Sequence, residues 1–255
     1  MTPPPDPITD PPPLGPRSVL LSTLLGVRPP RLRRNHLLAM AELFGVGEAT
    51  ADAVLADLVA VGDVSYENGR YRLGTRLTQR QRRQDQVRTD PRQRWNGRWS
   101  LAVVDPALGD GDGDGREQAG EVQRALTDLA YARWRDGVWL RPDNLGLRYA
   151  TVLQRSCTVW TADVPAGLDG RVITARLWDL DGWAEQARSL LDGFAGSLDI
   201  AGRFLVAVRA QHHLLRDPLL PDGLAPPGWP AQQLRTDFDR FATELEAELA
   251  LFLRG

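Results

Sequence analysis

The dipeptide Asn68-Gly69 places the strongest constraint on how the first third of this chain can fold. It stands in the middle of "VSYENGRYRL" (residues 64–73), between two stretches in which apolar and polar residues alternate. A two-residue β-hairpin turn needs a positive φ at both central positions, and Asn-Gly accepts this readily. The sequence therefore predicts a hairpin at residues 64–73, and the elements before it indicate which domain the hairpin completes.

Three short helices are predicted ahead of the hairpin. Their sequences are "SVLLSTLLG", which ends at Gly26, "LRRNHLLAMAELFGV", which stops at Gly45, and "GEATADAVLADLVAVGDV", which begins at Gly47. Three helices followed by a hairpin is the plan of a winged helix-turn-helix domain, which we expect over residues 17–90. The third helix then takes the place of the recognition helix, which enters the major groove of DNA.

The two faces of the predicted third helix differ in character. Spacings of three and four residues put one set of side chains on the same side, namely Ala51, Val54, Leu55, Leu58 and Val61. The other side carries Ala49, Asp52, Ala53, Ala56, Asp57 and Ala60. The first face is expected to pack, whereas the second is free to contact a partner and offers alanines and aspartates rather than arginines.

Positive charge is concentrated after the hairpin. The formal net charge is -2 and all 31 basic residues are arginines, so composition alone does not indicate a nucleic-acid partner. Between Arg70 and Arg98, however, there are ten arginines against only Asp85 and Asp90. This stretch is either a solvated charged linker or a phosphate-contacting segment, and the adjoining hairpin favours phosphate contact.

The rest of the chain predicts an α+β protein. Residues 1–16 are half proline and are expected to form a disordered tail. Over residues 91–178, a strand, a helix running through "REQAGEVQRALTDLAYARW", and strands at "GVWLRPD", "SCTVWTADV" and "RVITARLWDL" predict a ferredoxin-like domain. Residues 179–255 are expected to be helical and to end in a helix with an apolar stripe. That stripe, which we expect to pack on its own domain rather than on a second subunit, is formed by Leu234, Phe238, Phe241, Leu245, Leu249 and Phe252.

No motif in the sequence indicates catalysis or a metal. The run "DGDGDGREQAGE" (residues 110–121) fits a calcium-loop pattern, but a predicted strand precedes it where an EF-hand needs a helix, so we expect a linker. The histidines His36, His212 and His213 lack metal-site spacing, and Cys157 is expected to be a small core residue. We expect no enzyme activity and no cofactor. No apolar run reaches the roughly 18 residues of a membrane span, and the Pro-rich N-terminus lacks the apolar region of a signal peptide, so the protein is expected to be cytoplasmic.

Several strings, in this order, resemble the PaaX family, the phenylacetic-acid-pathway repressors of bacteria. They include "AELFGVGEATADAVLADLVAVGDV", "GRYRLGTRL", "WNGRWSLAVV", "DGVWLRPDNL", "DLDGWAEQAR" and "DPLLPDGLAPPGWPAQQLRTDF". The resemblance covers nearly all of residues 17–253. It implies a winged helix, a ferredoxin-like domain similar to Cas2, a C-terminal helical domain, and a DNA-binding regulator that forms a homodimer. The best known members are released from DNA by an aromatic acyl-coenzyme A, so an acyl-CoA is the implied effector.

The expected DNA-contacting residues combine the third helix with the basic stretch. Bases would face Thr50, Ala53 and Ala56, while phosphates would be contacted by Arg70, Arg72, Arg76, Arg80, Arg82 and Arg83. The sequence departs from the family at Asp52 and Asp57, where recognition helices of the family typically carry arginine. Each reversal replaces a phosphate contact with a repelling charge. The alternative hypothesis is therefore an effector-binding or protein-interaction module, derived from the same family, that has lost sequence-specific DNA binding.

Overall fold

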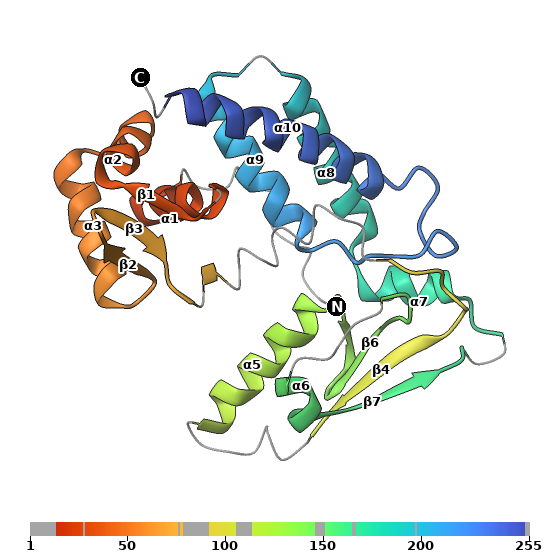
Figure 1. Ribbon diagram of the computed structural model, residues 1–255. Coiled ribbons are helices and arrows are strands. Elements are labelled where there is room, and N and C mark those ends of the chain that lie inside the picture. Colours follow the sequence, from red (N-terminus) through yellow and green to blue (C-terminus); the bar gives the residue numbers. More distant parts are fainter. Residues whose placement is uncertain are drawn as a thin grey trace, which may run out of the picture. The chain divides into compact units, whose positions relative to one another are not determined.

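The computed structural model has an α+β fold with two antiparallel sheets (Figure 1). It describes residues 14–27, 29–75, 77–78, 92–105, 114–145, 151–164, 167–196 and 198–252. The chain divides into two compact units, and the segments of each unit are not contiguous in sequence. Unit 1 comprises Met1–Asp85, Leu198–Leu205 and Ala242–Gly255, and unit 2 comprises Gln86–Ser197 and Val206–Phe241. The predicted tail lies almost wholly outside the described residues, and the domain boundaries expected at residues 90 and 178 stay predictions.

Unit 1 begins with helices and a three-stranded sheet. Its first elements are α1 (Pro16–Gly26), β1 (Arg31–Arg33), α2 (Arg34–Leu43), α3 (Glu48–Ala60), β2 (Val64–Glu67) and β3 (Arg70–Leu73). The sheet order is β1-β3-β2, and both strand pairs are antiparallel. The predicted hairpin is confirmed, because Asn68 and Gly69 adopt φ values of 50° and 74° and connect β2 to β3.

The second predicted helix starts later than the sequence suggested. Leu32 was expected inside this helix, but it lies in β1, opposite Tyr71 of β3, and is buried. A strand of three residues is too short to produce an alternating pattern of its own, and its pairing partner comes about 40 residues later in the chain. Strand β1 therefore depends on the hairpin that completes the sheet.

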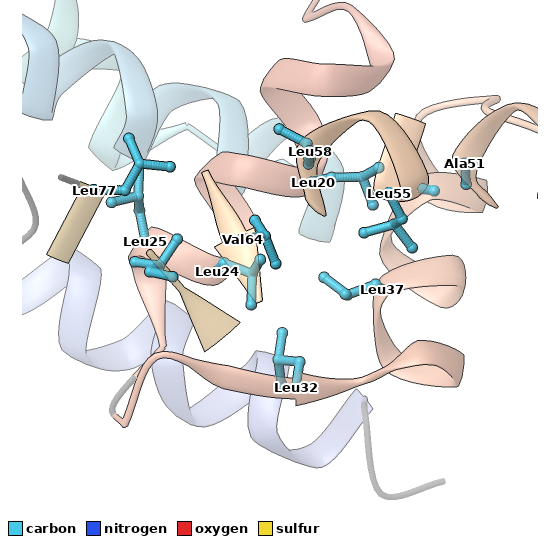
Figure 2. Packing of buried hydrophobic residues seen from close by; sticks show 12 residues of the cluster. Leu20, Leu24, Leu25, Leu32, Leu37, Ala51, Leu55, Leu58, Val64 and Leu77 are labelled. Carbon is cyan, nitrogen blue, oxygen red and sulfur yellow. The ribbon is translucent and has the colours of Figure 1, made fainter. Parts of the chain in front are cut away.

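The core of unit 1 joins the three helices to the inner face of this sheet (Figure 2). Leu37 of α2 and Leu55 and Leu58 of α3 are fully buried in it, together with Leu20 of α1. The predicted packing face of α3 is confirmed except at Val61, which is 64% exposed. Val61 follows the last helical residue, Ala60, and the chain turns away at that point.

Unit 2 contains the second sheet, with helices against both of its faces. The elements in chain order are β4 (Trp99–Val104), α5 (Asp114–Asp128), β5 (Ala132–Arg135), β6 (Val138–Pro142), α6 (Thr151–Ser156), β7 (Cys157–Ala162) and α7 (Gly170–Leu177). The strand order is β5-β6-β4-β7, and all three pairs are antiparallel. One apolar cluster joins the sheet to α5 and α6, and another joins the sheet to α7. Both faces of the sheet are therefore covered at the central strands β4 and β6, whereas Trp160 of the edge strand β7 remains 61% exposed.

Two sequence-based assignments in unit 2 were wrong. The helix predicted to continue through Trp134 ends at Asp128, because Ala130 adopts a left-handed φ of 58° and the chain then enters β5. The stretch predicted as a strand at residues 171–180 is largely α7. The Asp169 side chain caps this helix by accepting a hydrogen bond from the Arg171 backbone N–H at 2.9 Å, which outweighs the β-branched residues that follow.

Three predicted C-terminal helices are confirmed as α8 (Leu180–Ala195), α9 (Ile200–Leu214) and α10 (Ala231–Phe252). The α10 stripe is buried within the chain at Leu234, Phe238, Phe241, Leu245 and Leu249, and Phe252 at its end is 38% exposed. Packing within the chain, rather than on a second subunit, thus accounts for most of the stripe. In the described part of the chain, no helix has the length and apolar character needed to cross a membrane.

Candidate nucleic-acid interface

The helices α2 and α3 present one uncovered surface. Gly45, with a φ of 70°, turns the chain after α2, and α3 begins three residues later at Glu48. The predicted base-facing residues Thr50, Ala53 and Ala56 are all exposed, whereas Ala51 on the opposite side of the helix is fully buried. The geometry therefore leaves the expected face of α3 open to a partner.

Asp52 on this surface already has a partner within unit 1. The Arg34 guanidinium donates from Nε to Oδ1 of Asp52 at 2.8 Å, from Nη2 to Oδ2 at 2.5 Å, and from Nη2 to Oε1 of Glu48 at 2.6 Å. The hydrogen bonds from Arg34 lower the pKa of Asp52 below its ordinary value, and those to Asp52 and Glu48 raise the pKa of Arg34. Arg34 is the first residue of α2, and sequence reasoning missed it because 18 positions separate it from Asp52.

Asp57 behaves differently from Asp52. It lies five residues after Asp52 in α3, is exposed, and has no ion-pair partner within the described residues. Arg34 is thus shared by two carboxylates, Asp52 and Glu48, whereas Asp57 has no cation beside it among the described residues.

The hairpin supplies an aromatic pair and arginines. The rings of Tyr66 and Tyr71 lie 4.7 Å apart, and Tyr66 is 55% exposed. Burial raises the pKa of Tyr71, with smaller contributions from Tyr66 and Asp52. Arg72 forms an exposed ion pair with Glu67 at 3.3 Å. The predicted DNA-contacting residues Arg76, Arg80, Arg82 and Arg83 lie outside the described residues.

The register of the sheet brings four arginines onto one face. Arg31 of β1 is paired with Arg72 of β3, and Arg33 is paired with Arg70. Directly paired residues point to the same side of a sheet, and the residues between them, such as Tyr71, point to the core on the other side. We call this solvent side, formed by Arg31, Arg33, Ser65, Glu67, Arg70 and Arg72, the outer sheet face. Sequence reasoning identified Arg70 and Arg72 but missed Arg31 and Arg33.

The pKa of His36, in the first turn of α2, is affected by two of these arginines. Burial lowers the pKa of His36, and the positive charges of Arg33 and Arg70 lower it further. The other sequence candidates form no second site among the residues that the structure describes. Within the described residues no cluster of possible metal ligands occurs, and Asp114, Gly115 and Glu121 of the calcium-like run lie in α5 rather than in a binding loop. Cys157 is half-buried against the unit 2 core, and burial raises the pKa of its thiol.

Unit 2 also has a small pocket. It has a volume of about 380 Å³ and is lined by residues of α7, of the start of α8, and of the chain at 224–227. Arg171 and Thr174 provide polar groups, and Trp178 and Leu224 provide apolar ones. Asp179 and Asp181 also line the pocket, so it combines one cation and two carboxylates with apolar walls.

The fold and the site define an α+β protein of two compact units, one of which carries an uncovered helix pair beside a basic sheet face. No family model matches the chain, and no curated protein matches it. Among solved structures, it is similar to the uncharacterized protein Rv0674 from Mycobacterium tuberculosis, with 34% identity and a TM-score of 0.71. The match covers 95% of this chain and 100% of that one. The chain therefore belongs to the same protein family as Rv0674.

Proposed function

We propose that the chain is a PaaX-like DNA-binding transcriptional regulator, which acts as a homodimeric repressor. The observation that carries the proposal is the order of elements in unit 1, α1-β1-α2-α3-β2-β3 with sheet order β1-β3-β2. In this order α2 and α3 correspond to a helix-turn-helix, and the β2–β3 hairpin corresponds to the wing. The exposed side of α3 then occupies the position from which recognition helices contact bases.

The sheet of unit 2 supports the same domain plan. Its elements follow the order β4-α5-β5-β6-α6-β7, and its strand order is β5-β6-β4-β7. Two βαβ-like halves that interlock in one antiparallel sheet are the pattern of a ferredoxin-like domain, which the resemblance to PaaX implies at this place in the chain. Similarity of this domain to Cas2 does not carry nuclease activity with it, because function depends on the site and not on the fold.

In the proposed complex, α3 lies in the major groove and the wing contacts the backbone. Thr50 offers a hydroxyl, and Ala53 and Ala56 offer methyl groups that suit apolar contact with thymine. Arg70 and Arg72 supply positive charge from the wing. Asp52 opposes binding less than its sequence position suggested, because Arg34 neutralises it and brings a cation to the same part of the surface.

A second function competes with the first. Glu48, Asp52 and Asp57 outnumber Arg34, the one cation that pairs with any of them among the described residues. The open face of α3 therefore stays acidic, which is unfavourable beside DNA phosphates. This observation favours the alternative that the chain binds an effector or another protein and no longer reads a DNA sequence.

Binding of the full chain to DNA separates the two functions. A labelled duplex from the region upstream of the chain's own gene is titrated at several salt concentrations, beside a random duplex of the same length. A sequence-reading regulator is expected to bind the upstream duplex at least about 1,000-fold more tightly than the random one. Equal affinity for the two duplexes would reject the regulator and leave the alternative.

Release by an effector is tested on the same complex. An aromatic acyl-CoA is added, with free coenzyme A and the free aromatic acid as controls. We propose that the unit 2 pocket accepts the uncharged aromatic acyl end, since Trp178 and Leu224 provide apolar walls and Arg171 offers hydrogen-bond donors for the thioester carbonyl. Release by the thioester alone, abolished by Arg171→Ala, is the expected result. Equal release by the free acid would show that the thioester is not recognised.

A further inference from the structure

The outer sheet face carries two rows of side chains that run across the three strands. One row consists of Arg31, Arg72 and Ser65, and the other consists of Arg33, Arg70 and Glu67. Neighbouring side chains in a row have Cβ atoms about 5 Å apart, and the rows are separated by about 7 Å along the strands. Four guanidinium groups therefore share a small surface with one carboxylate.

This arrangement is unfavourable for the protein alone. Arginines placed directly opposite one another on paired strands repel each other, and both β1–β3 outer-face pairs are of this kind. Charged residues on an edge strand discourage aggregation, which would explain Arg31 and Arg33 on β1. It does not explain Arg70 and Arg72, because β3 is the central strand of the sheet.

The four cations are open to a ligand. Arg31, Arg33 and Arg72 are exposed, and Arg70 is partly so. Glu67 pairs with Arg72 across the rows at 3.3 Å, but both side chains remain more than half exposed. Within the described residues, Arg31, Arg33 and Arg70 have no ion-pair partner. Most of the positive charge on this face is therefore not neutralised by other described residues.

We propose that the outer sheet face is a phosphate-binding surface for double-stranded DNA, with Arg31 and Arg33 of β1 as ligands beside Arg70 and Arg72. The choice of DNA as the partner rests on the proposed function. The composition of the face agrees with it, because every outer-face residue is Arg, Ser or Glu and none offers the apolar anchor on which protein interfaces depend. Phosphate oxygens require only charge and hydrogen-bond donors, which arginine provides in pairs.

In this proposal, phosphate contact and base contact are made by different elements, the outer sheet face and α3. Phosphate attraction comes from the sheet, so the exposed side of α3 does not need arginines. The acidic Asp57 is then tolerated, because the sheet rather than α3 supplies the counter-charge for the DNA backbone.

The test compares two double variants of the full chain that remove the same charge. Arg31→Gln with Arg33→Gln changes only β1 and leaves the wing arginines in place. Arg133→Gln with Arg240→Gln removes two exposed arginines of unit 2 as the matched control. Affinity for a duplex is measured from about 50 to 200 mM salt, and circular dichroism melting checks that both variants fold. Loss of two phosphate contacts is expected to reduce the slope of log K against log[salt] by about 1.8 and the affinity at 100 mM salt by about 60-fold.

The outcomes distinguish this inference from the proposed function. If the wild type binds random and upstream duplexes equally but the β1 variant still loses slope, the surface stands and the sequence-reading regulator is wrong. If the wild type prefers the upstream duplex and the β1 variant keeps the wild-type slope of log K against log[salt], the proposed phosphate-binding surface is wrong. The proposed regulator function is then unaffected. Absence of any duplex binding at 50 mM salt would overturn both. Equal loss in the control variant would show a general charge effect and would also overturn the surface.

Discussion

Unit 2 contains arginines that are almost fully buried, whereas the arginines on the outer sheet face of unit 1 are exposed or partly exposed. Arg141 of β6 and Arg235 of α10 are 1% and 2% exposed. The Arg72 side chain on the outer sheet face of unit 1 is 54% exposed. All basic residues of the chain are arginines, so residue type cannot distinguish these roles. The comparison teaches that burial does: Arg141 and Arg235 are enclosed by the fold, whereas the arginines of the outer sheet face are open to a ligand.

The largest effect that would test this comparison is expected at Arg235. Its Nη2 donates to Asp217 Oδ2 at 2.7 Å, and both side chains are almost fully buried. Arg235→Ala leaves the Asp217 carboxylate buried without its cation and is expected to lower the free energy of unfolding by about 3–5 kcal/mol. Urea denaturation measures the loss. Arg240→Ala, on the exposed side of the same helix, is the control and should cost less than about 1 kcal/mol.

The buried histidine of unit 2 predicts a pH dependence of similar size. The ring of His213 stacks on Trp183 at 4.4 Å, and burial lowers its pKa to about 4. Because the folded pKa lies below the unfolded value near 6.5, stability is fully present above pH 6.5 and is lost as the pH falls toward 4. The loss is about 3 kcal/mol. Denaturation at several pH values should show this slope in wild type and in the exposed control His212→Gln. A slope unchanged in His213→Phe would contradict the assignment.

Arg141 provides a sharper test, because it is buried and no carboxylate pairs with it in the part of the chain that the structure describes. Its Nη1 donates to the Pro142 carbonyl at 3.1 Å, its Cζ lies 5.0 Å from the Tyr131 ring centre, and its Nε has no hydrogen-bond partner. Replacing a poorly compensated buried charge with an apolar side chain of similar length removes a desolvation cost. Arg141→Met is therefore expected to raise the free energy of unfolding by about 1 kcal/mol. A fall of that size in urea denaturation would mean that the guanidinium holds the sheet together.

On the unit 1 side, the comparison predicts changes in DNA affinity rather than in stability. Asp57→Arg adds a cation to the exposed side of α3 and is expected to strengthen duplex binding at 100 mM salt about eightfold. Asp52→Arg should give less, because it breaks the pair with Arg34 and places two cations together. Titration of a labelled duplex measures both, and Asp136→Arg in unit 2 is the control. Weaker binding by Asp57→Arg would mean that the aspartate itself contacts a base.

The smallest expected effect is on His36. Arg33→Gln removes one of the two positive charges that lower the pKa of this histidine, so the pKa should rise toward its ordinary value while the contribution of burial remains. An NMR titration of the ring protons follows the change. Arg31→Gln is the control, since Arg31 does not contribute to the shift. Equal shifts in the two variants would show that the arginine positions on the outer sheet face differ from those described.

The sequence was informative where local signals decide the structure. Asn68-Gly69 predicted the hairpin because its two φ values are set within the turn, and the apolar spacing of α3 predicted Leu55 and Leu58 inside. Prediction failed where distant residues decide. The helix assigned through Trp134 contained no local sign that Ala130 would adopt a left-handed conformation and release β5 to pair with β6.

The candidate site was predictable in the same uneven way. The exposure of Thr50, Ala53 and Ala56 followed from the helical period. The Arg34–Asp52 pair did not, because it depends on how α2 packs against α3. The outer sheet face could not be predicted, because it depends on the register of β1 against β3. The three residues of β1 do not determine that register by themselves. Whether the site reads DNA stays a prediction.

The discontinuous composition of unit 1 has a consequence for its synthesis. A ribosome releases the residues up to Asp85 early, but unit 1 also includes Leu198–Leu205 and part of α10. At typical rates of elongation, the interval between residue 85 and the end of α10 lasts roughly 10–30 s. During this interval Phe44 lacks the edge-on contact with Phe204, whose ring centre lies 5.5 Å away in the finished fold. The basic sheet would thus be synthesised well before Leu198–Leu205 and α10, so unit 1 reaches its full structure only after these later residues have been made.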